Sequence, residues 1–149
     1  MNEPFNDYEI DCFRRAGRII SEVREWAKTA IVPGAEMRFV LETVEDMIRQ
    51  LGAEPGFPAQ SSRNSIAAHY CTSPHDMTVY EEGDCVKIDI GAHIDGYVVD
   101  TAATVDLSSD GRWAALIEAA DGALAAAIKL VKDGTPTGTL GAVIERKIV

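Results

Sequence analysis

Residues 84–105 constrain the fold of this chain more than any other stretch. They contain two runs rich in β-branched residues, joined by the dipeptide Asp95-Gly96. Asp-Gly tolerates the positive φ angles of a two-residue hairpin turn, so the stretch predicts a β-hairpin. Such a turn places Ile94 opposite Tyr97 and thereby fixes the remaining register. The further pairs expected are Ala92 with Val99, Ile90 with Thr101, and Ile88 with Ala103.

The same register places two carboxylates on one face of the hairpin. Asp89 is expected opposite Ala102 and Asp100 opposite Gly91, which makes the acids diagonal neighbours roughly 7–8 Å apart at the backbone. Two acids at that distance can share one or two metal ions, whereas without a cation they repel and one takes up a proton. An ordinary amphipathic hairpin with both acids in solvent is the alternative, although Asp is depleted in strands.

Composition bounds the size and class of the protein. The chain has 149 residues, which is enough for one domain with a core and too few for two full domains. Hydrophobic residues make up 46% and charged residues 26% of the sequence, as in globular proteins. The net charge of −10 argues against a sequence-independent electrostatic grip on nucleic acid or anionic lipid. Neither a nucleic-acid nor a membrane partner is therefore expected.

The cysteines and the termini bear on the compartment. Cys12, Cys71 and Cys85 are odd in number and form no Cys-x-x-Cys pair, which argues against a disulfide framework and against a thiolate zinc site. The N-terminus has neither a basic region nor an apolar run, and no later segment approaches 18 uncharged apolar residues. We therefore expect a cytoplasmic protein.

Helices are expected where apolar residues recur at helical spacing, over residues 7–31, 37–51, 108–133 and 140–149. Asn6 and Glu9 resemble a capping box ahead of the first of them. Between the second helix and the hairpin, residues 54–78 are punctuated by Pro, Gly and Ser, and only two short strands, 57–59 and 65–68, are expected there. Irregular connections of this length are often functional.

The three histidines differ in context. His69 follows the second short strand at a loop edge and is a candidate for chemistry, although a lone histidine is usually structural. His75 lies in Ser-Pro-His-Asp, which predicts a solvated turn. His93 lies beside the hairpin turn on the Asp89 face and would border a site there, or be exposed at the tip.

The chain resembles the methionine aminopeptidases in three motifs: Gly56-Phe57-Pro58, Asn64-Ser-Ile-Ala-Ala-His69-Tyr70 and Lys87-Ile-Asp89-Ile-Gly91-Ala-His-Ile-Asp95-Gly96-Tyr-Val-Val-Asp100-Thr-Ala. The Ala-Ala-His-Tyr form resembles their type 2 branch, which is archaeal and eukaryotic. Asp100 follows Asp89 by eleven positions and Asp89 follows His69 by twenty, and both steps fit the family. The resemblance runs from the first helix to the last residue.

This resemblance implies the α/β (α+β) pita-bread fold, a curved antiparallel sheet backed by helices and built from two halves. Residues 1–149 would be its first half, a single N-terminal portion of the catalytic domain. By the same resemblance, Asp89 chelates one metal ion and Asp100 bridges two, with Co, Mn, Fe or Zn as the divalent pair. His69 would contact the scissile peptide, as catalytic and substrate-binding residue. The implied hydrolase reaction removes the N-terminal methionine of nascent proteins by attack of a metal-activated hydroxide.

The chain also departs from the family. The remaining ligands, one His and two Glu, are expected after the second Asp, yet all three histidines precede Asp100. The chain therefore carries two of five expected ligands. We expect a truncated or split gene product, or a second chain that supplies the other half, and an incomplete site in this chain alone.

Two alternatives stay open at this point. A proline-directed or creatinase-like hydrolase shares the fold and the Asp pair, but Ala-Ala-His69-Tyr and the lack of a large domain before the first helix favour the methionine enzymes. A non-catalytic relative that serves as a binding module is the second alternative. The presence of both Asp89 and Asp100 argues against it, and the missing half argues for it.

Overall fold

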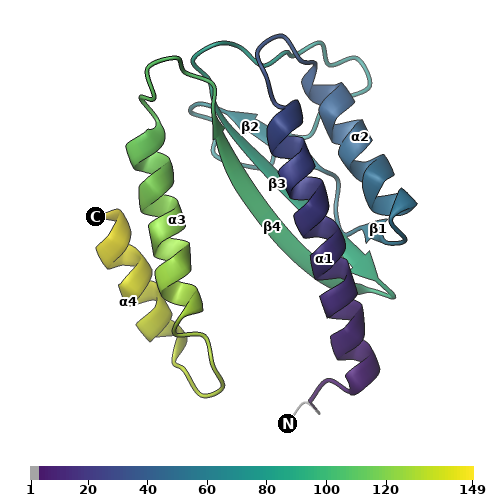
Figure 1. Cartoon of the computed structure of the whole chain (residues 1–149), viewed down its shortest axis with the longest axis vertical. Coiled ribbons are helices and arrows are strands. Elements are labelled where there is room, and N and C mark those ends of the chain that lie inside the picture. Colours follow the sequence, from purple (N-terminus) through teal and green to yellow (C-terminus); the bar gives the residue numbers. More distant parts are fainter. Residues whose placement is uncertain (1–3) are drawn as a thin grey trace. The chain divides into compact units, whose positions relative to one another are not determined.

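The structure, a computed structural model, describes residues 4–149 and divides the chain into two compact units, Met1–Ser109 and Asp110–Val149. The first contains α1 (Asp7–Ala30), α2 (Met37–Gln50), β1 (Glu54–Pro55), β2 (Gln60–Arg63), β3 (Cys85–Ile94) and β4 (Tyr97–Asp106) (Figure 1). The second contains α3 (Ala114–Ile128) and α4 (Thr137–Ile148).

Strand β3 is the middle row of an antiparallel sheet. β4 pairs with β3 along its whole length, while β1 and β2 share the other edge. β1 pairs at Ala92 and His93, and β2 pairs from Val86 to Asp89. Between them, the amide of Gly56 donates to the carbonyl of Gly91 over 2.9 Å. The sheet is therefore organised around the strand that carries Asp89.

The predicted hairpin is confirmed in turn and in register. Asp95 and Gly96 have φ angles of 52° and 84°, as a type I′ turn requires. Every predicted pair is present: Ile94 with Tyr97, Ala92 with Val99, Ile90 with Thr101, Ile88 with Ala103, Asp89 with Ala102 and Gly91 with Asp100. A shift by one residue would turn the buried face of the strand into solvent, which is why the register is so strongly specified.

The core lies between this sheet and the first two helices (Figure 1). α1 buries one residue in every three or four: Cys12, Ala16, Ile20, Val23 and Ala27. α2 does the same with Met37, Val40, Leu41, Val44 and Ile48. β3 contributes alternate residues: Val86, Ile88, Ile90 and Ala92. These two periods are those of a helix stripe and of a strand face, so the odd-numbered residues of β3 lie on the opposite face of the sheet.

The amino-terminal turn of α1 is fastened to the hairpin turn. The predicted capping box is confirmed, since Asn6 Oδ1 accepts from the Glu9 amide at 3.1 Å and Glu9 Oε2 accepts from the Asn6 amide at 2.7 Å. The Tyr97 hydroxyl donates to Glu9 Oε1 at 2.8 Å, and the Tyr8 hydroxyl donates to the carboxylate of Asp95. Three aromatic rings pack edge to face at the same place: Phe5, Phe13 and Tyr97.

The two short strands predicted at 57–59 and 65–68 are wrong; the strands are β1 and β2 instead. Pro58 has no amide to offer to a neighbouring strand, and the Ala59 amide donates to Glu45 of α2 at 3.1 Å. β2 ends where Asn64 takes a left-handed conformation with φ 53°. Beyond it, the exposed residues 65–68 have no strand assignment.

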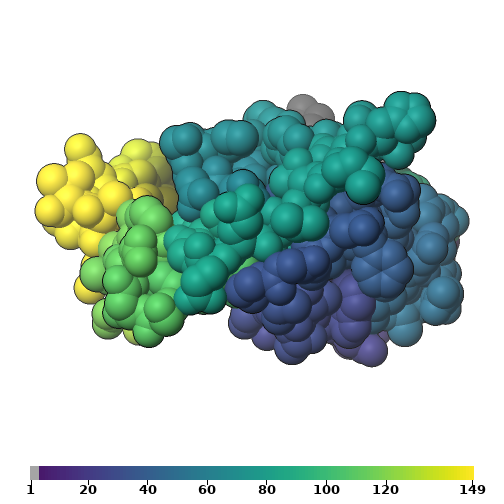
Figure 2. All heavy atoms as spheres, turned by 90° about the horizontal axis from the view of Figure 1, so that it is seen from above, coloured from purple at the N-terminus to yellow at the C-terminus, as the bar shows by residue number. Residues whose placement is uncertain are grey.

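The connection between β2 and β3 packs against the start of α2. The Met37 amide donates to the carbonyl of Thr78 at 2.9 Å, and the Gly34 amide donates to the carbonyl of Tyr80 at 2.8 Å. In the space-filling view, the teal spheres of this connection lie against the blue spheres of α2 (Figure 2). Tyr80 is fully buried, so the irregular segment is part of the folded body of the unit.

The third helix begins at Ala114 and not at the predicted Ser108. Asp106 Oδ1 accepts from the amide and hydroxyl of Ser108 at 2.8 and 2.5 Å, a local turn that competes with helix. The fourth helix begins at Thr137, earlier than predicted. Within residues 4–149, none of the helices combines the length and apolar character needed to cross a membrane.

Candidate metal centre

Both aspartates lie on the sheet face opposite α1 and α2, which we call the carboxylate face. Its residues are Lys87, Asp89, Gly91 and His93 of β3 and Val98, Asp100, Ala102 and Thr104 of β4. Asp89 is half-buried and Asp100 is exposed. Their cross-strand neighbours on this face are Ala102 and Gly91, which are too small to separate them. The register therefore leaves both carboxylates free to point at one position.

The two carboxylates influence each other electrostatically. Burial raises the pKa of Asp89, and the neighbouring charge of Asp100 and a hydrogen bond with Asp100 raise it further. Like charges that share a site disfavour the doubly ionised state. A cation bound between the two acids would remove this repulsion, which makes the pair a candidate cation site.

His69 is brought to this site by the connection that follows β2. The residue is exposed and left-handed, with φ 65°, and its charge lowers the pKa of Asp89. The other two histidines have different surroundings. His75 is exposed in a turn, as predicted, and His93 Nδ1 accepts from the amide of Gly96 at 3.2 Å, which makes it part of the hairpin turn.

Gln60 is a polar neighbour of Asp89 that sequence reasoning missed. It is the direct cross-strand partner of Asp89 in β2, and its Oε1 is buried without a hydrogen-bond partner among the described residues. A buried amide oxygen without a donor is costly, and next to a carboxylate it calls for a proton donor or a cation. Nothing in the sequence marked Gln60, because the strand was expected three residues earlier.

Phe57 forms an apolar wall on the same face. A Cβ atom added at Gly91 would overlap the Phe57 ring, with Cδ1 only 2.8 Å away. The ring thus lies directly on Gly91, the residue opposite Asp100. A glycine inside a strand often marks a close approach of this kind, so Gly91 was a signal from which such a neighbour could have been predicted. The part of the face that carries the two acids is therefore bordered by an apolar surface.

The donor set fits a divalent cation. Carboxylate oxygens are hard ligands of the kind that Mg²⁺, Mn²⁺ and similar ions prefer, and Gln60, the strand partner of Asp89, adds a buried amide oxygen. The set is nevertheless small. Among residues 4–149, no three His, Cys, Asp or Glu side chains group closely enough to hold a metal ion by themselves.

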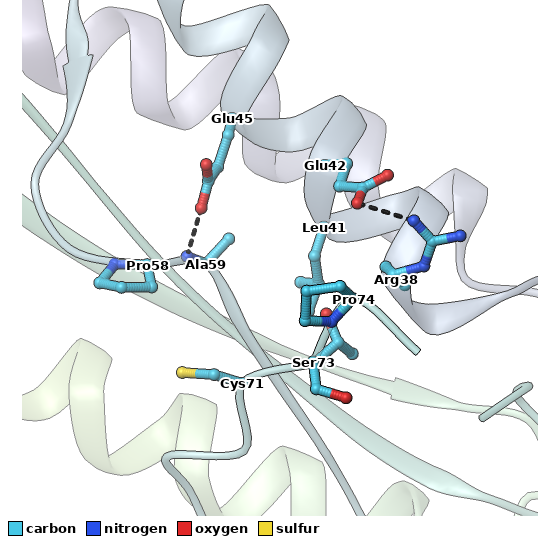
Figure 3. Close-up of a pocket in the computed structure, with 10 residues that line it drawn as sticks. Arg38, Leu41, Glu42, Glu45, Pro58, Ala59, Cys71, Ser73 and Pro74 are labelled. Carbon is cyan, nitrogen blue, oxygen red and sulfur yellow. Dashed lines mark hydrogen bonds and ion pairs between the residues drawn. The ribbon is translucent and has the colours of Figure 1, made fainter. Parts of the chain in front are cut away.

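A separate hollow of about 190 Å³ lies between α2 and the connection after β2 (Figure 3). Arg38 pairs with Glu42 at 3.0 Å, and Glu45 accepts from the Ala59 amide at 3.1 Å. The acidic side chains that line the hollow are thus already engaged. Cys71 also lines it, but neither aspartate of the carboxylate face does, so the hollow is distinct from the candidate metal centre.

Comparison with known proteins places these features in context. Residues 11–149 match metallopeptidase family M24. The methionine aminopeptidase of Methanocaldococcus jannaschii is 44% identical over 133 residues, which cover 89% of this chain and 45% of that protein. That of Pyrococcus horikoshii is 43% identical over 140 residues, covering 94% of this chain and 47% of that protein. The chain spans about half the length of the curated relatives it matches.

Solved structures give the same result for the fold. A methionine aminopeptidase from Thermotoga maritima superimposes with a TM-score of 0.89 at 26% identity, covering 99% of this chain and 62% of that one. A prolidase from Pyrococcus furiosus reaches a TM-score of 0.82 at 25% identity, covering 96% of this chain and 43% of that one. Together with the antiparallel sheet and its backing helices, these likenesses confirm the predicted pita-bread architecture.

Proposed function

The chain belongs to metallopeptidase family M24, and we propose that it forms the N-terminal part of a methionine aminopeptidase of the type 2, archaeal and eukaryotic branch. The observation that carries the proposal is the pair of diagonal carboxylates, Asp89 and Asp100, on one face of a hairpin. The chain that bears them is 44% identical to an archaeal methionine aminopeptidase. The proposed substrate is the N-terminal peptide of a nascent protein.

Two divalent ions, drawn from Co, Mn, Fe and Zn, are the proposed cofactors. Asp89 would chelate one ion with both carboxylate oxygens, and Asp100 would bridge the two. Divalent ions at such a site lower the pKa of water and polarise a peptide carbonyl. Gln60 would accept a hydrogen bond from the ligand shell, since its Oε1 is buried and unpaired among the described residues.

The remaining tasks fall to side chains that border the carboxylate face. His69 would donate a hydrogen bond to an oxygen of the scissile peptide, and it lies close enough to Asp89 to lower the pKa of that carboxyl. Phe57 would offer its ring to the methionine side chain and exclude water beside the acids, because it covers Gly91. One face of the sheet would thus hold the metal ions and, beside them, offer an apolar surface to the methionine side chain of the substrate.

The two other predicted functions have less support. An X-Pro aminopeptidase from Thermotoga maritima superimposes with a TM-score of 0.77 at 22% identity, a likeness that concerns the fold alone. The 44% identity to methionine aminopeptidases is much higher, so proline-directed hydrolysis is not favoured. A non-catalytic binding module would have no need of Asp89 and Asp100 on one face.

The rest of the active site requires partners for these residues. One His and two Glu ligands are proposed to come from a further segment or from a second chain, in keeping with relatives about twice as long. We also place the protein in the cytoplasm. Cys12, Cys71 and Cys85 are free thiols, a state that a reducing compartment maintains.

Asp100→Asn tests the proposal directly. In a form extended to the length of the relatives and supplied with Mn²⁺ or Co²⁺, we expect release of methionine from a Met-Gly peptide. Asp100→Asn should lower kcat/KM by at least about 100-fold, because loss of a bridging carboxylate exceeds the effect of altering an outer-shell group. Glu118→Gln, an exposed acid on α3, is the matched control. Full activity in Asp100→Asn would contradict the metal assignment.

A further inference from the structure

The segment from Asn64 to His69 joins the end of β2 to the proposed catalytic histidine, and its two end residues have unusual backbones. Asn64 has φ 53° and His69 has φ 65°. The left-handed conformation is disfavoured for residues that carry a Cβ atom, although Asn and His adopt it more often than most. Conformations of this kind persist where surrounding contacts determine them, and they cluster at functional sites.

Asn64 is held by all four of its polar groups. Its side-chain Nδ2 donates to Asp84 Oδ1 at 2.7 Å, and its Oδ1 accepts from the Cys85 amide at 2.9 Å. Its main-chain amide donates to the Cys85 carbonyl at 2.9 Å, and its carbonyl accepts from Lys87 Nζ at 2.7 Å. Asp84 is only 5% exposed, so water competes poorly for the side-chain bond.

These bonds attach Asn64 to the beginning of β3, the strand that carries Asp89. The far end of the segment is attached separately. Directly after His69, the carbonyl of Tyr70 accepts from the Ser61 amide of β2 at 3.1 Å, and the Tyr70 hydroxyl donates to Asp76 at 2.7 Å. The exposed residues 65–68 lie between the two attachments. The position of His69 is therefore set by the ends of the segment.

From this arrangement we propose that Asn64 is a positioning residue, which fixes the imidazole of His69 relative to the carboxylate of Asp89. The side chain of Asn64 touches neither substrate nor metal in this role; it acts by tying the segment to β3. The inference rests on the proposed function for the task of His69. Its structural part, the placement of the segment, does not depend on that function.

A charge-balanced exchange of two residues tests the inference. Asn64→Asp keeps the acceptor for the Cys85 amide, loses the donor to Asp84 and sets two carboxylates against each other. Adding Asp84→Asn restores a donor opposite an acceptor. In the extended form with Mn²⁺, we expect Asn64→Asp to lower kcat by about 10- to 100-fold with little change in KM, because misplaced catalytic groups have effects of that size. The double variant should recover most of this loss.

Two structural readouts separate positioning from simple stabilisation. Crystal structures should show His69 leaving its left-handed conformation in Asn64→Asp and regaining it in the double variant. Bound Mn²⁺ should broaden the His69 ring signals less in Asn64→Asp than in the unaltered protein. Ser65→Ala, an exposed neighbour, is the control and should change neither. Asn64→Gly, which accepts positive φ, carries the same test if Asn64→Asp does not fold.

The outcomes distinguish this inference from the proposed function. If Asn64→Asp lowers only the melting temperature, with His69 in place and kcat unchanged, the inference is wrong while the proposed function stands. If Mn²⁺ fails to broaden Asp89 and Asp100 in the unaltered protein, the proposed function is wrong. In that case the crystal structures alone decide whether Asn64 places His69.

Discussion

The pairing of Asp89 with Asp100 is expected to lower the stability of the metal-free fold. In the folded chain without metal, burial and the charge of Asp100 raise the pKa of Asp89, so the fold takes up a proton there more readily than the unfolded chain does. The resulting penalty is absent below the unfolded pKa of about 3.9. The penalty grows as the pH rises from the unfolded pKa to the raised folded pKa, and it is complete above the folded pKa.

Removal of one charge should therefore stabilise the metal-free fold. Asp100→Asn is expected to raise the free energy of unfolding at pH 7 by about 0.2–1 kcal/mol, the range of cross-strand pairs, and the gain should vanish near pH 3. Urea unfolding in a metal chelator measures it, with Glu118→Gln as the control. Excess Mn²⁺ should reverse the order of stability. A variant that is less stable at pH 7 in chelator would contradict the electrostatic account.

The strands show which parts of the fold a sequence can predict. The hairpin was predictable to the residue because Asp95-Gly96 sets the turn locally and alternation sets the faces. β1 and β2 were not, because their extent depends on hydrogen bonds to β3, tens of residues away. Phe57 and Pro58 lie between β1 and β2 and belong to neither strand, and the Phe57 ring covers Gly91 of β3.

The same difference applies to the candidate site. Asp89 and Asp100 were predictable because both belong to the hairpin, whose register is local. Gln60 and Phe57 were missed because their places follow from the pairing of β2 and from the break before it. His69 was identified by its context and by family resemblance, whereas its left-handed backbone left no trace in the sequence pattern.

The contact between Phe57 and Gly91 leads to a prediction about packing. Gly91→Ala should destabilise the fold by about 1–3 kcal/mol, the usual result of forcing extra atoms into a packed site. Phe57→Ala should remove most of that effect in a double-mutant cycle measured by urea unfolding. Gly17→Ala in α1, where nothing lies within 4 Å of the added atom, is the control and should stabilise by about 0.5–1 kcal/mol. Additive effects of the two changes would contradict a direct contact.

The chain as a whole carries one face of the candidate site and helices with exposed apolar residues. In the second unit, α3 and α4 pack together and bury Ala123 and Ala127. Large side chains of this unit remain more than half exposed: Leu116, Leu124, Ile128, Val131 and Ile148. We expect further polypeptide to cover part of this surface, because extended apolar surface is uncommon on monomers.

We expect the 149-residue chain to bind Mn²⁺ weakly and to release no methionine from a Met-Gly peptide. The reason is that the two carboxylates of Asp89 and Asp100 supply only a partial ligand set. Titration calorimetry measures the first expectation and a peptide assay the second. The extended form, assayed in parallel, is the positive control. Robust turnover by the shorter chain, abolished in Asp100→Asn, would show that these residues suffice.

The fastening of α1 to the hairpin turn has a consequence for how the protein is made. Tyr8 and Asp95 are separated by 87 positions in the sequence, and Glu9 and Tyr97 are separated by 88. A ribosome adds roughly 5–20 residues per second, so α1 waits for several seconds after it emerges before its partner exists. During that interval the apolar stripe of the helix has no sheet to cover. The helix is thus synthesised several seconds before the hairpin that secures it, and a chaperone can bind its apolar stripe during that interval.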